Sequence, residues 1–372
     1  MTRPCLAAIT LDSQGGGVAT VSRLLWQVFR DRWGDSCRLF TLVDGAGAEL
    51  RSLESSTAAR LGFGTVLARA QMLRQCPWVF YSHLAVARVQ QFVPPPVRRP
   101  YAIFLHGIEA WRNLPSGMRR VLDGAALRVA NSQFTARRVA EAHPGVGPIA
   151  VCPLALPPDT TRAAVPAAED LAGIGPHAVI LVARMITAEH YKGHDELLEA
   201  WPAVVSRVPD AQLVFVGSGD DSDRLRAKAA SLGIGGSLVL TGFVSAERLQ
   251  ALYQRAAMFA MPSRGEGFGL VYLEAMSYGL PCIGSIHDAA GEIIDDGVSG
   301  VLVDQTDTAS LSECIVQLLE DEGLRQAMGA AGQRRLQREF SYAAFSRRLL
   351  SHIEQTIGDP VREVASVSGA GR

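Results

Sequence analysis

The sequence predicts an α/β fold made of two doubly wound domains. Short apolar runs of strand length alternate with amphipathic helical patterns along almost the whole chain, which is typical of parallel α/β architecture. The alternation breaks once, over residues 153–170, where four prolines lie among many Ala and Thr residues, as expected of a linker. A length of 372 residues also suits two domains of ordinary size.

Residues 1–160 are predicted to form the first domain. A glycine run, Gly15 to Gly17, follows its first strand and precedes a helix over about 18–30. Asn131 and Ser132 are expected to begin a further helix, because both residue types cap helices well. The predicted strands are 6–10, 39–43, 79–82, 102–106 and 127–130.

Residues 166–340 are predicted to form the second domain. Its strands are expected at 178–182, 212–216, 238–240, 258–260, 282–284 and 300–303, and its helices near 194–206, 221–231, 245–255, 269–278 and 308–320. A last helix, about 342–357, comes after both sheets are complete, and we expect it to pack back on the first domain. Ligand sites in such sheets lie outside the carboxyl ends of the strands.

The composition favours an ordinary globular protein, with 48% hydrophobic and 20% charged residues. No apolar stretch is long enough to span a bilayer, and the N-terminus lacks the apolar core and cleavage site of a signal peptide. We therefore expect a cytoplasmic protein. The cysteines have no metal-ligand spacing and predict buried thiols in a reducing compartment, without disulfides: Cys5, Cys37, Cys76, Cys152, Cys282 and Cys314.

The two halves differ in charge. Residues 1–165 hold 19 Arg, no Lys and 10 acidic residues, a net charge of +9, and the remainder carries −10. This asymmetry is either ordinary solvated surface or a sign that the basic half meets an anionic acceptor or the inner face of an anionic membrane. The basic residues of greatest interest are Arg98, Arg99, Arg112, Arg119, Arg120, Arg137 and Arg138.

Lysine is rare in this chain. Among 36 basic residues only Lys192 and Lys228 are lysines. A lysine that persists among so many arginines suggests a need for a compact point charge. Lys228 lies in a charged helical stretch and is expected to be solvated, whereas Lys192 lies in a loop beside other signals.

The richest cluster of motifs spans residues 263–281. A predicted strand runs into a loop with glycines at 265, 267 and 269, and a helix begins near Gly269. Such a loop exposes backbone N–H groups at a helix N-terminus, which favours an anion. Glu266 and Glu274 are spaced so that both can face the loop and accept hydrogen bonds from hydroxyl groups. The alternative is a tight strand–helix turn with an exposed glutamate.

Glu266 and Glu274, with seven residues between them, resemble the E-x7-E motif of retaining glycosyltransferases of family 4. That family has the GT-B fold, in which two Rossmann-like domains face each other across a cleft. The resemblance covers most of the chain. It includes Arg184 with the later Lys192, the segments 216–219, 241–244 and 130–132, and the glycine run 15–17. The sequence departs from the family over 287–292, where a Gly-Gly-x-x-Glu pattern is common.

The resemblance implies a role for each matching residue. Arg184 and Lys192 would bind the donor diphosphate and stabilise the leaving group, Glu266 would hold sugar hydroxyls, and Glu274 the ribose hydroxyls. Gly16 would allow close approach from the first domain. The remaining expected donor contacts are Gly217, Val244 (near the base), Gly267 and the N–H groups of Phe268, Gly269 and Leu270.

His106 ends a predicted strand and precedes Gly107. A residue at the carboxyl end of a parallel strand lies where ligands bind, and the family often has a histidine here, near the reacting sugar. The alternative is a buried histidine with satisfied hydrogen bonds. Glu109 and Trp111 follow closely and are weaker candidates for the acceptor side.

No metal site is expected. Asp221 and Asp223 form an Asp-x-Asp pattern, but they stand at the start of a predicted surface helix, where the helix dipole favours acidic residues. No other segment has convincing ligand spacing. The prediction is therefore metal-independent transfer without a cofactor, with the nucleotide sugar as substrate.

The resemblance implies transfer of a hexose (glucose, mannose or galactose) from a UDP- or GDP-sugar to a glycan or lipid-linked acceptor, with retention, in cell-surface polysaccharide or glycoconjugate biosynthesis. A nucleic-acid partner is not expected. Two alternatives stay open, a GT-B nucleotide-sugar 2-epimerase and a non-catalytic nucleotide-sugar-binding protein. A nicotinamide-binding enzyme is disfavoured, because the glycine run 15–17 lacks the G-x-G-x-x-G spacing.

Overall fold

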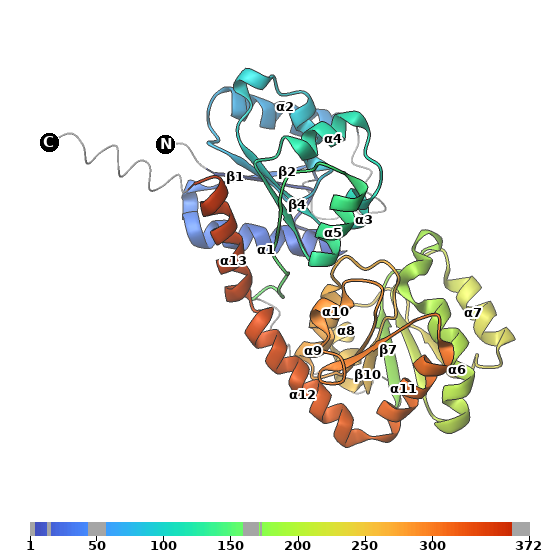
Figure 1. Cartoon of the computed structure of the whole chain (residues 1–372). Coiled ribbons are helices and arrows are strands. Elements are labelled where there is room, and N and C mark those ends of the chain that lie inside the picture. Colours follow the sequence, from blue (N-terminus) through green and yellow to red (C-terminus); the bar gives the residue numbers. More distant parts are fainter. Residues whose placement is uncertain (1–3, 13–15, 44–56, 159–170, 172, 359–372) are drawn as a thin grey trace. The chain divides into compact units, whose positions relative to one another are not determined.

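A computed structural model describes residues 4–12, 16–43, 57–158, 171 and 173–358. The chain divides into two compact units, one of residues 1–157 with 342–372 and one of residues 158–341. Each unit contains its own sheet and covering helices (Figure 1). Gly15, most of the expected linker and the end of the chain lie outside the described residues.

The first unit holds a six-stranded parallel sheet in the order β2-β1-β3-β4-β5-β6. The direction of winding reverses between β1 and β3, so these neighbouring strands flank the switch point where doubly wound sheets bind ligands. The strands are β1 (Cys5–Ala8), β2 (Arg38–Thr41), β3 (Val79–Tyr81), β4 (Tyr101–Leu105), β5 (Leu127–Ala130) and β6 (Ile149–Val151).

The sequence predicted five of these strands to within two residues. It missed β6, a half-buried edge strand of three residues set between glycine- and proline-rich segments. Ser132 caps its helix as expected, since its hydroxyl accepts a hydrogen bond of 2.9 Å from Thr135 N–H. The helices are α1 (Gly16–Trp33), α2 (Thr57–Met72), α3 (Ile108–Trp111), α4 (Ser116–Asp123), α5 (Gln133–Ala142) and the 3₁₀ segments η1 (Gly34–Ser36), η2 (Val86–Gln91) and η3 (Pro95–Val97).

The last helix, α13 (Tyr342–Thr356), belongs to the first unit although it follows the whole second unit in the chain. Its apolar face buries Phe345, Leu349 and Ile353. His352 Nε2 lies 3.1 Å from the carbonyl oxygen of Val151 in the edge strand β6. The chain therefore crosses from the first unit to the second and returns.

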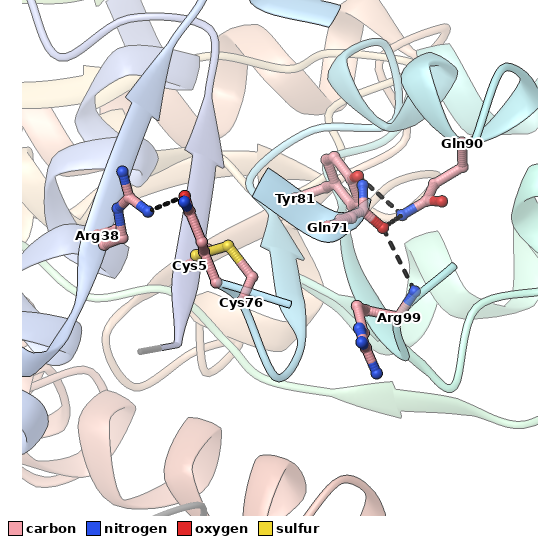
Figure 2. Close-up of a disulfide and its surroundings, with 8 residues drawn as sticks. Cys5, Arg38, Gln71, Cys76, Tyr81, Gln90 and Arg99 are labelled. Carbon is pink, nitrogen blue, oxygen red and sulfur yellow. Dashed lines mark hydrogen bonds between the residues drawn. A yellow bond between two sulfur atoms is a disulfide. The ribbon is translucent and has the colours of Figure 1, made fainter. Parts of the chain in front are cut away.

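One expectation about the cysteines is wrong. Cys5 and Cys76 form a disulfide that joins the start of β1 to the segment before β3 (Figure 2). The two residues are 71 positions apart, but the parallel pairing of Cys5 with Val79 brings the ends of these strands together. Spacing along the sequence could not reveal this pair, because a sheet register creates it. Cys152, Cys282 and Cys314 are thiols, as expected.

The second unit holds a six-stranded parallel sheet in the order β12-β11-β10-β7-β8-β9. All six strands match the predicted positions, with one differing by a single residue. Central strands such as β7 are continuous apolar runs because helices cover both faces of the sheet. The strands are β7 (Ala178–Val182), β8 (Gln212–Val216), β9 (Leu238–Leu240), β10 (Met258–Ala260), β11 (Cys282–Ser285) and β12 (Gly300–Val303).

The helices of the second unit include one long element that the sequence did not reveal. α12 buries few side chains, and its close contact depends on small residues: a Cβ on Gly329 would lie 1.8 Å from the carbonyl oxygen of Gly279. Its pattern therefore lacks a clear apolar stripe. The helices are η5 (Thr187–Lys192), α6 (His194–Arg207), α7 (Ser222–Ser231), α8 (Ala246–Arg255), α9 (Leu270–Ser277), α10 (Ala290–Ile293), α11 (Thr308–Glu320) and α12 (Glu322–Glu339).

Within the described residues, no helix is both long enough and apolar enough to cross a membrane.

Candidate functional site

The winding of the second sheet reverses between β7 and β10, which are paired neighbours. Loops that leave the carboxyl ends of two such strands form the usual ligand site of a doubly wound sheet. Arg184 follows β7, and the segment 262–269, here called the donor loop, follows β10. Most of the second-domain residues predicted from the sequence are thus in or next to the segments that leave this switch point.

Lys192 reaches the donor loop because two backbone features fix the segment before it. Gly193 has a φ of 91°, and a Cβ there would lie 2.9 Å from Pro262, so only glycine fits. Arg264 N–H also donates a hydrogen bond of 2.8 Å to the carbonyl of Tyr191. The two loops are therefore joined on both sides of Lys192.

Lys192 and Glu266 form an ion pair, with Nζ 2.5 Å from Oε2. Their side chains are only 17% and 18% exposed, so water screens the pair weakly. Burial by itself would lower the pKa of Lys192, but the Glu266 carboxylate raises the pKa above its ordinary value. Lys192 is therefore a fixed cation at neutral pH.

Arg184 presents its guanidinium to solvent. Its side chain is 70% exposed and pairs with Glu189, whose side chain is 14% exposed. An exposed guanidinium can turn toward a phosphate and bind it through two N–H groups at once. Arg184 and Lys192 are thus two cations on the segment that follows β7.

The donor loop ends at Gly269, which has a φ of 92° and immediately precedes α9. A Cβ on Gly269 would lie 2.5 Å from the ring of Tyr272 and 3.2 Å from Cγ of Glu266, so glycine is required here. Gly267 and Phe268 are buried, and Phe268 packs edge-on against Phe340 with centroids 6.0 Å apart. The first N–H groups of α9, which begin at Leu270, have no partner inside the helix and suit an anion.

Glu274 lies one turn into α9 and is half-buried. Tyr253 donates a hydrogen bond of 3.0 Å to its Oε2. Burial raises the pKa of Glu274 to about 7, and the Tyr253 hydrogen bond only partly offsets this effect. A carboxyl group that titrates at neutral pH is typical of a functional site.

Gly217 has a structural task, and its contact with the donor stays a prediction. It has a φ of 144°, and a Cβ there would lie 2.1 Å from the carbonyl oxygen of Ala183. Gly217 therefore lets the chain pass next to the residue before Arg184. Val244 is half-buried just before α8, and its proximity to a base remains a prediction.

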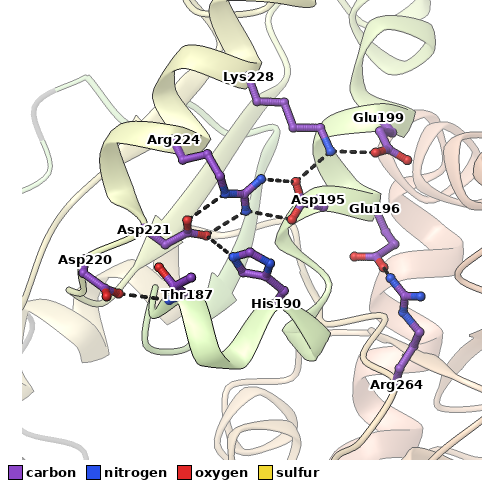
Figure 3. A network of polar contacts seen from close by, with 10 residues as sticks. All are labelled: Thr187, His190, Asp195, Glu196, Glu199, Asp220, Asp221, Arg224, Lys228 and Arg264. Atoms are coloured by element: carbon purple, nitrogen blue, oxygen red, sulfur yellow. Dashed lines mark hydrogen bonds and ion pairs between the residues drawn. The ribbon is translucent and has the colours of Figure 1, made fainter.

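A network of ion pairs supports the segment that carries Lys192 (Figure 3). Thr187 N–H donates to Asp220 at 2.9 Å, and His190 lies 3.3 Å from Asp221. Arg224 then joins Asp221 to Asp195 with contacts of 2.7 and 2.8 Å. The sequence did not reveal this network, because its members come from η5, α6 and α7.

The same network accounts for the Asp-x-Asp pattern. Asp221 is buried and paired with a guanidinium, while Asp223 is exposed and pairs with Arg226. No group of three or more His, Cys, Asp and Glu side chains in the described part of the chain is arranged to hold a metal ion.

In the first unit, His106 follows β4 and is held by three neighbours. Its Nε2 lies 2.6 Å from the carbonyl oxygen of Ser82, and its N–H donates to Glu109 Oε1 at 2.6 Å. Asn131 donates a hydrogen bond of 2.7 Å to its carbonyl oxygen. A carbonyl oxygen can only accept, so Nε2 donates this bond, and Nδ1 is the ring nitrogen that is left for a ligand.

His83 joins this cluster and was not predicted. It lies just beyond β3, and its ring is 5.1 Å from that of His106. Burial lowers the pKa of His83 to about 4, so the ring is neutral. Burial would raise the pKa of Glu109, but the positive charge of a protonated His83 or His106, with the hydrogen bond from the His106 backbone N–H, holds that pKa below its ordinary value. The histidine after the strand 79–82 was the signal that could have identified it.

Gly16 begins α1 with a φ of 65°, and a Cβ there would meet nothing within 4 Å. It follows β1 at the switch point of the first sheet. Gly16 and His106 belong to the first unit, and Lys192 and Glu266 to the second. That all four act on one donor remains a prediction.

Comparison with known proteins supports a glycosyltransferase. Residues 176–335 match the family model of glycosyl transferases group 1. The chain is 35% identical over 246 residues to a GDP-mannose-dependent alpha-(1-6)-phosphatidylinositol monomannoside mannosyltransferase of Mycolicibacterium smegmatis. This match covers 61% of the present chain and 63% of the relative, so it spans less than two thirds of the relative's length.

Solved structures share the fold of the chain. The structure of Anabaena HepE in complex with UDP and glucose superposes with a TM-score of 0.75 at 17% identity, covering 95% of this chain and all of that one. The lipopolysaccharide outer core galactosyltransferase WaaB superposes with a TM-score of 0.69 at 16% identity, covering 95% and 99%. The chain therefore has the two-domain GT-B fold of these glycosyltransferases, and its residues 176–335 match the glycosyl transferases group 1 family.

Proposed function

We propose that the protein is a retaining glycosyltransferase that moves a hexose from a UDP- or GDP-sugar to a hydroxyl group of a glycan or lipid-linked acceptor. The observation that carries the proposal is the Lys192–Glu266 pair at the switch point of the second sheet. It places a cation for the diphosphate beside a carboxylate for sugar hydroxyls.

The chemical demand on such an enzyme is cleavage of the bond between the sugar C1 and the diphosphate oxygen. Arg184 and Lys192 would stabilise the negative charge that develops on the leaving diphosphate, and the N-terminus of α9 would add its backbone N–H groups. Glu266 would fix the sugar and Glu274 the ribose. These groups all follow β7 or β10, so one sheet edge would hold the whole donor.

Retention needs no protein nucleophile in this scheme. The acceptor hydroxyl attacks C1 from the face that the diphosphate leaves, and a phosphate oxygen of the departing group takes the proton. His106, with Nδ1 as an acceptor, would orient a hydroxyl of the reacting sugar. The scheme requires neither a metal ion nor another cofactor.

The names of the relatives suggest which donors to test first. The mycobacterial relative is named for GDP-mannose, and the structure of HepE contains UDP and glucose. Both nucleotides therefore belong in a first test. A lipid-linked or glycan acceptor would give the protein a place in cell-surface polysaccharide or glycoconjugate synthesis.

A helix of the first unit supports contact with an anionic membrane. On α2, the exposed fractions of Leu61, Val66 and Met72 are 67%, 55% and 48%. Arg69 is exposed on the same helix, and residues 57–75 contain no acidic residue. Exposed apolar side chains beside an arginine suit the interface of an anionic bilayer. The protein should sediment with phosphatidylglycerol vesicles at low salt. Equal sedimentation with neutral phosphatidylcholine vesicles would contradict contact with an anionic membrane.

The whole proposal is tested by a thermal-shift screen with UDP, GDP, UDP-glucose, UDP-galactose and GDP-mannose, followed by an assay for release of the nucleoside diphosphate. Either the uridine or the guanosine ligands should bind and raise the melting temperature. The nucleotide sugar of the ligands that bind should then be turned over, with release of its nucleoside diphosphate. Formation of UDP-N-acetylmannosamine from UDP-N-acetylglucosamine would favour an epimerase instead. Binding without any turnover would favour a non-catalytic binding protein.

A further inference from the structure

The carboxylate of Asp288 lies buried behind the donor loop. Only 8% of this residue is exposed, and it follows β11, the strand next to β10. It stands in the segment 287–292, where the sequence departs from the common Gly-Gly-x-x-Glu pattern. A glycine would place no carboxylate at this position.

Asp288 accepts three hydrogen bonds. Its Oδ2 receives the fully buried hydroxyl of Ser263 and, at 3.3 Å, the N–H of Glu266. Its Oδ1 receives the N–H of Ala290 at 2.9 Å. In return, Ala289 N–H donates to the carbonyl oxygen of Glu266 at 3.2 Å. The Asp288 carboxylate thus holds the N–H of Glu266, and the neighbouring Ala289 holds its carbonyl oxygen.

The ionisable groups that face Asp288 are acids. The Glu266 carboxylate faces it from the donor loop and the phenol of Tyr272 from α9, while His287, its neighbour in the chain, lies 3.3 Å from Asp304. None of the ion pairs within the described residues involves Asp288. Burial raises the pKa of Asp288 to about 6, against the opposing effect of its hydrogen bonds with Ser263 and Ala290.

We infer that Asp288 is a positioning residue for Glu266: its ionised carboxylate holds the donor loop in the geometry in which Glu266 meets Lys192 and binds the donor sugar. Protonation places a hydrogen on the carboxyl group. Ser263 can then turn its hydroxyl to accept, but the N–H of Glu266 can only donate, and it is left facing a neutral carboxyl group, which is a weaker acceptor. The inference rests on the proposed function, because it assigns the sugar to Glu266.

The test separates Glu266 from Glu274. The measured quantity is the affinity for a nucleotide sugar divided by the affinity for its nucleoside diphosphate, at pH values from 5 to 8. The two ligand pairs are UDP-glucose with UDP, and GDP-mannose with GDP. Both ligands carry the ribose, so an effect of Glu274 cancels in this ratio. The terminal phosphate of the diphosphate titrates near pH 6 as well. The ratio measured for wild type is therefore divided by the ratio measured for Asp288→Asn, which gives a double ratio. The titration of the ligand is the same for both proteins, so it cancels.

This double ratio should be high above pH 7 and fall below pH 6, by up to about tenfold for each pH unit. Asp304→Asn, which changes a half-exposed carboxylate that also follows a strand of the same sheet, should behave as wild type. A double ratio that does not change with pH would overturn the inference. Wild type that binds none of the four ligands at any pH would overturn the proposed function instead.

Kinetics give a second readout. Asp288→Asn should raise the KM for the donor at pH 7.5 more than it lowers kcat, because the loop is misplaced while Lys192 stays. Asp288→Glu, which restores the charge on a longer side chain, should recover part of the loss. A variant that unfolds would be recognised by its melting temperature. Ser263→Ala, which removes one hydrogen-bond donor and leaves the charge of Asp288, would then take its place. It should show a smaller rise in KM, and its double ratio should still fall below pH 6.

Discussion

Tyr253 and Glu274 join two helices of the second unit through one hydrogen bond, in which the phenol donates to Oε2 of the glutamate at 3.0 Å. Tyr253 lies on α8 and also stacks on Tyr278, with centroids 5.3 Å apart. The stacking fixes the phenol, and the phenol fixes the carboxyl group. The position of Glu274 is therefore fixed by side chains of its own unit.

The titration of Glu274 should be visible in nucleotide binding. Burial raises its pKa from the ordinary 4.5 to about 7, so the carboxyl group is neutral at pH 5 and ionised at pH 9. An ionised carboxylate is the stronger acceptor for ribose hydroxyls. The Kd of wild type for UDP or GDP, divided by that of Glu274→Gln, should fall as pH rises through about 7. Tyr253→Phe should raise the pH at which this ratio changes, because it removes a hydrogen bond to the carboxylate. A ratio that does not change with pH would show that Glu274 does not bind the ribose.

Glu274→Ala should raise the donor KM and lower kcat.

Gly193→Ala should weaken donor binding by moving Lys192. Gly193 combines a φ of 91° with a contact of 2.9 Å to Pro262, while Gly233 has a φ of 73° and nothing within 4 Å of a Cβ. Gly233→Ala is therefore a matched control that introduces backbone strain alone, about 1 kcal/mol or more. Both variants should lower the melting temperature, and Gly193→Ala should lower it further and reduce nucleotide affinity. Equal effects of the two on nucleotide affinity would refute the role of this contact.

Reduction of the Cys5–Cys76 disulfide should destabilise the first unit. The bond closes a loop between residues 71 positions apart, and cross-linking such a loop stabilises a fold by up to about 4 kcal/mol. Urea unfolding with and without dithiothreitol measures the difference. Cys5→Ala with Cys76→Ala should reproduce the reduced protein, and Cys314→Ser should match wild type. Identical unfolding curves with and without reductant would show that the bond contributes nothing.

His83 should make the first unit sensitive to acid. Its pKa is lowered from the ordinary 6.5 to about 4 in the folded protein by burial, so unfolding takes up a proton between these values. Stability should fall as pH drops from about 6.5 to 4, by up to about 3 kcal/mol. His83→Gln should flatten this part of the profile. The free energy of unfolding in urea, measured at several pH values for wild type and for His83→Gln, tests this prediction.

The sequence predicted the second sheet almost residue by residue, because strands such as β7 and β8 are unbroken apolar runs bounded by glycine and proline. It failed where stability comes from contacts distant in sequence. α2 contains Gly62 and Gly64, which weaken a helical pattern, and α12 packs through Gly329, which carries no apolar signal.

The site divides in the same way. Glu266, Lys192 and Arg184 were identified from local motifs, and the structure brings the first two within 2.5 Å of each other. Asp288 and His83 were missed because their importance depends on what faces them across a loop or strand. Cys5 and Cys76 show the same limit, since only the register of the first sheet brings them together.

The most direct test of a donor site at Lys192 compares the only two lysines of the chain. Lys192 pairs with Glu266 in the donor loop, whereas Lys228 on α7 pairs with Asp195 and Glu199 on α6. Each is changed to alanine, and release of UDP or GDP from the sugar nucleotide that wild type uses is measured under saturating acceptor. Lys192→Ala should lose nearly all turnover, while Lys228→Ala should keep turnover close to wild type. Wild-type turnover by a folded Lys192→Ala enzyme would contradict a donor site at Lys192.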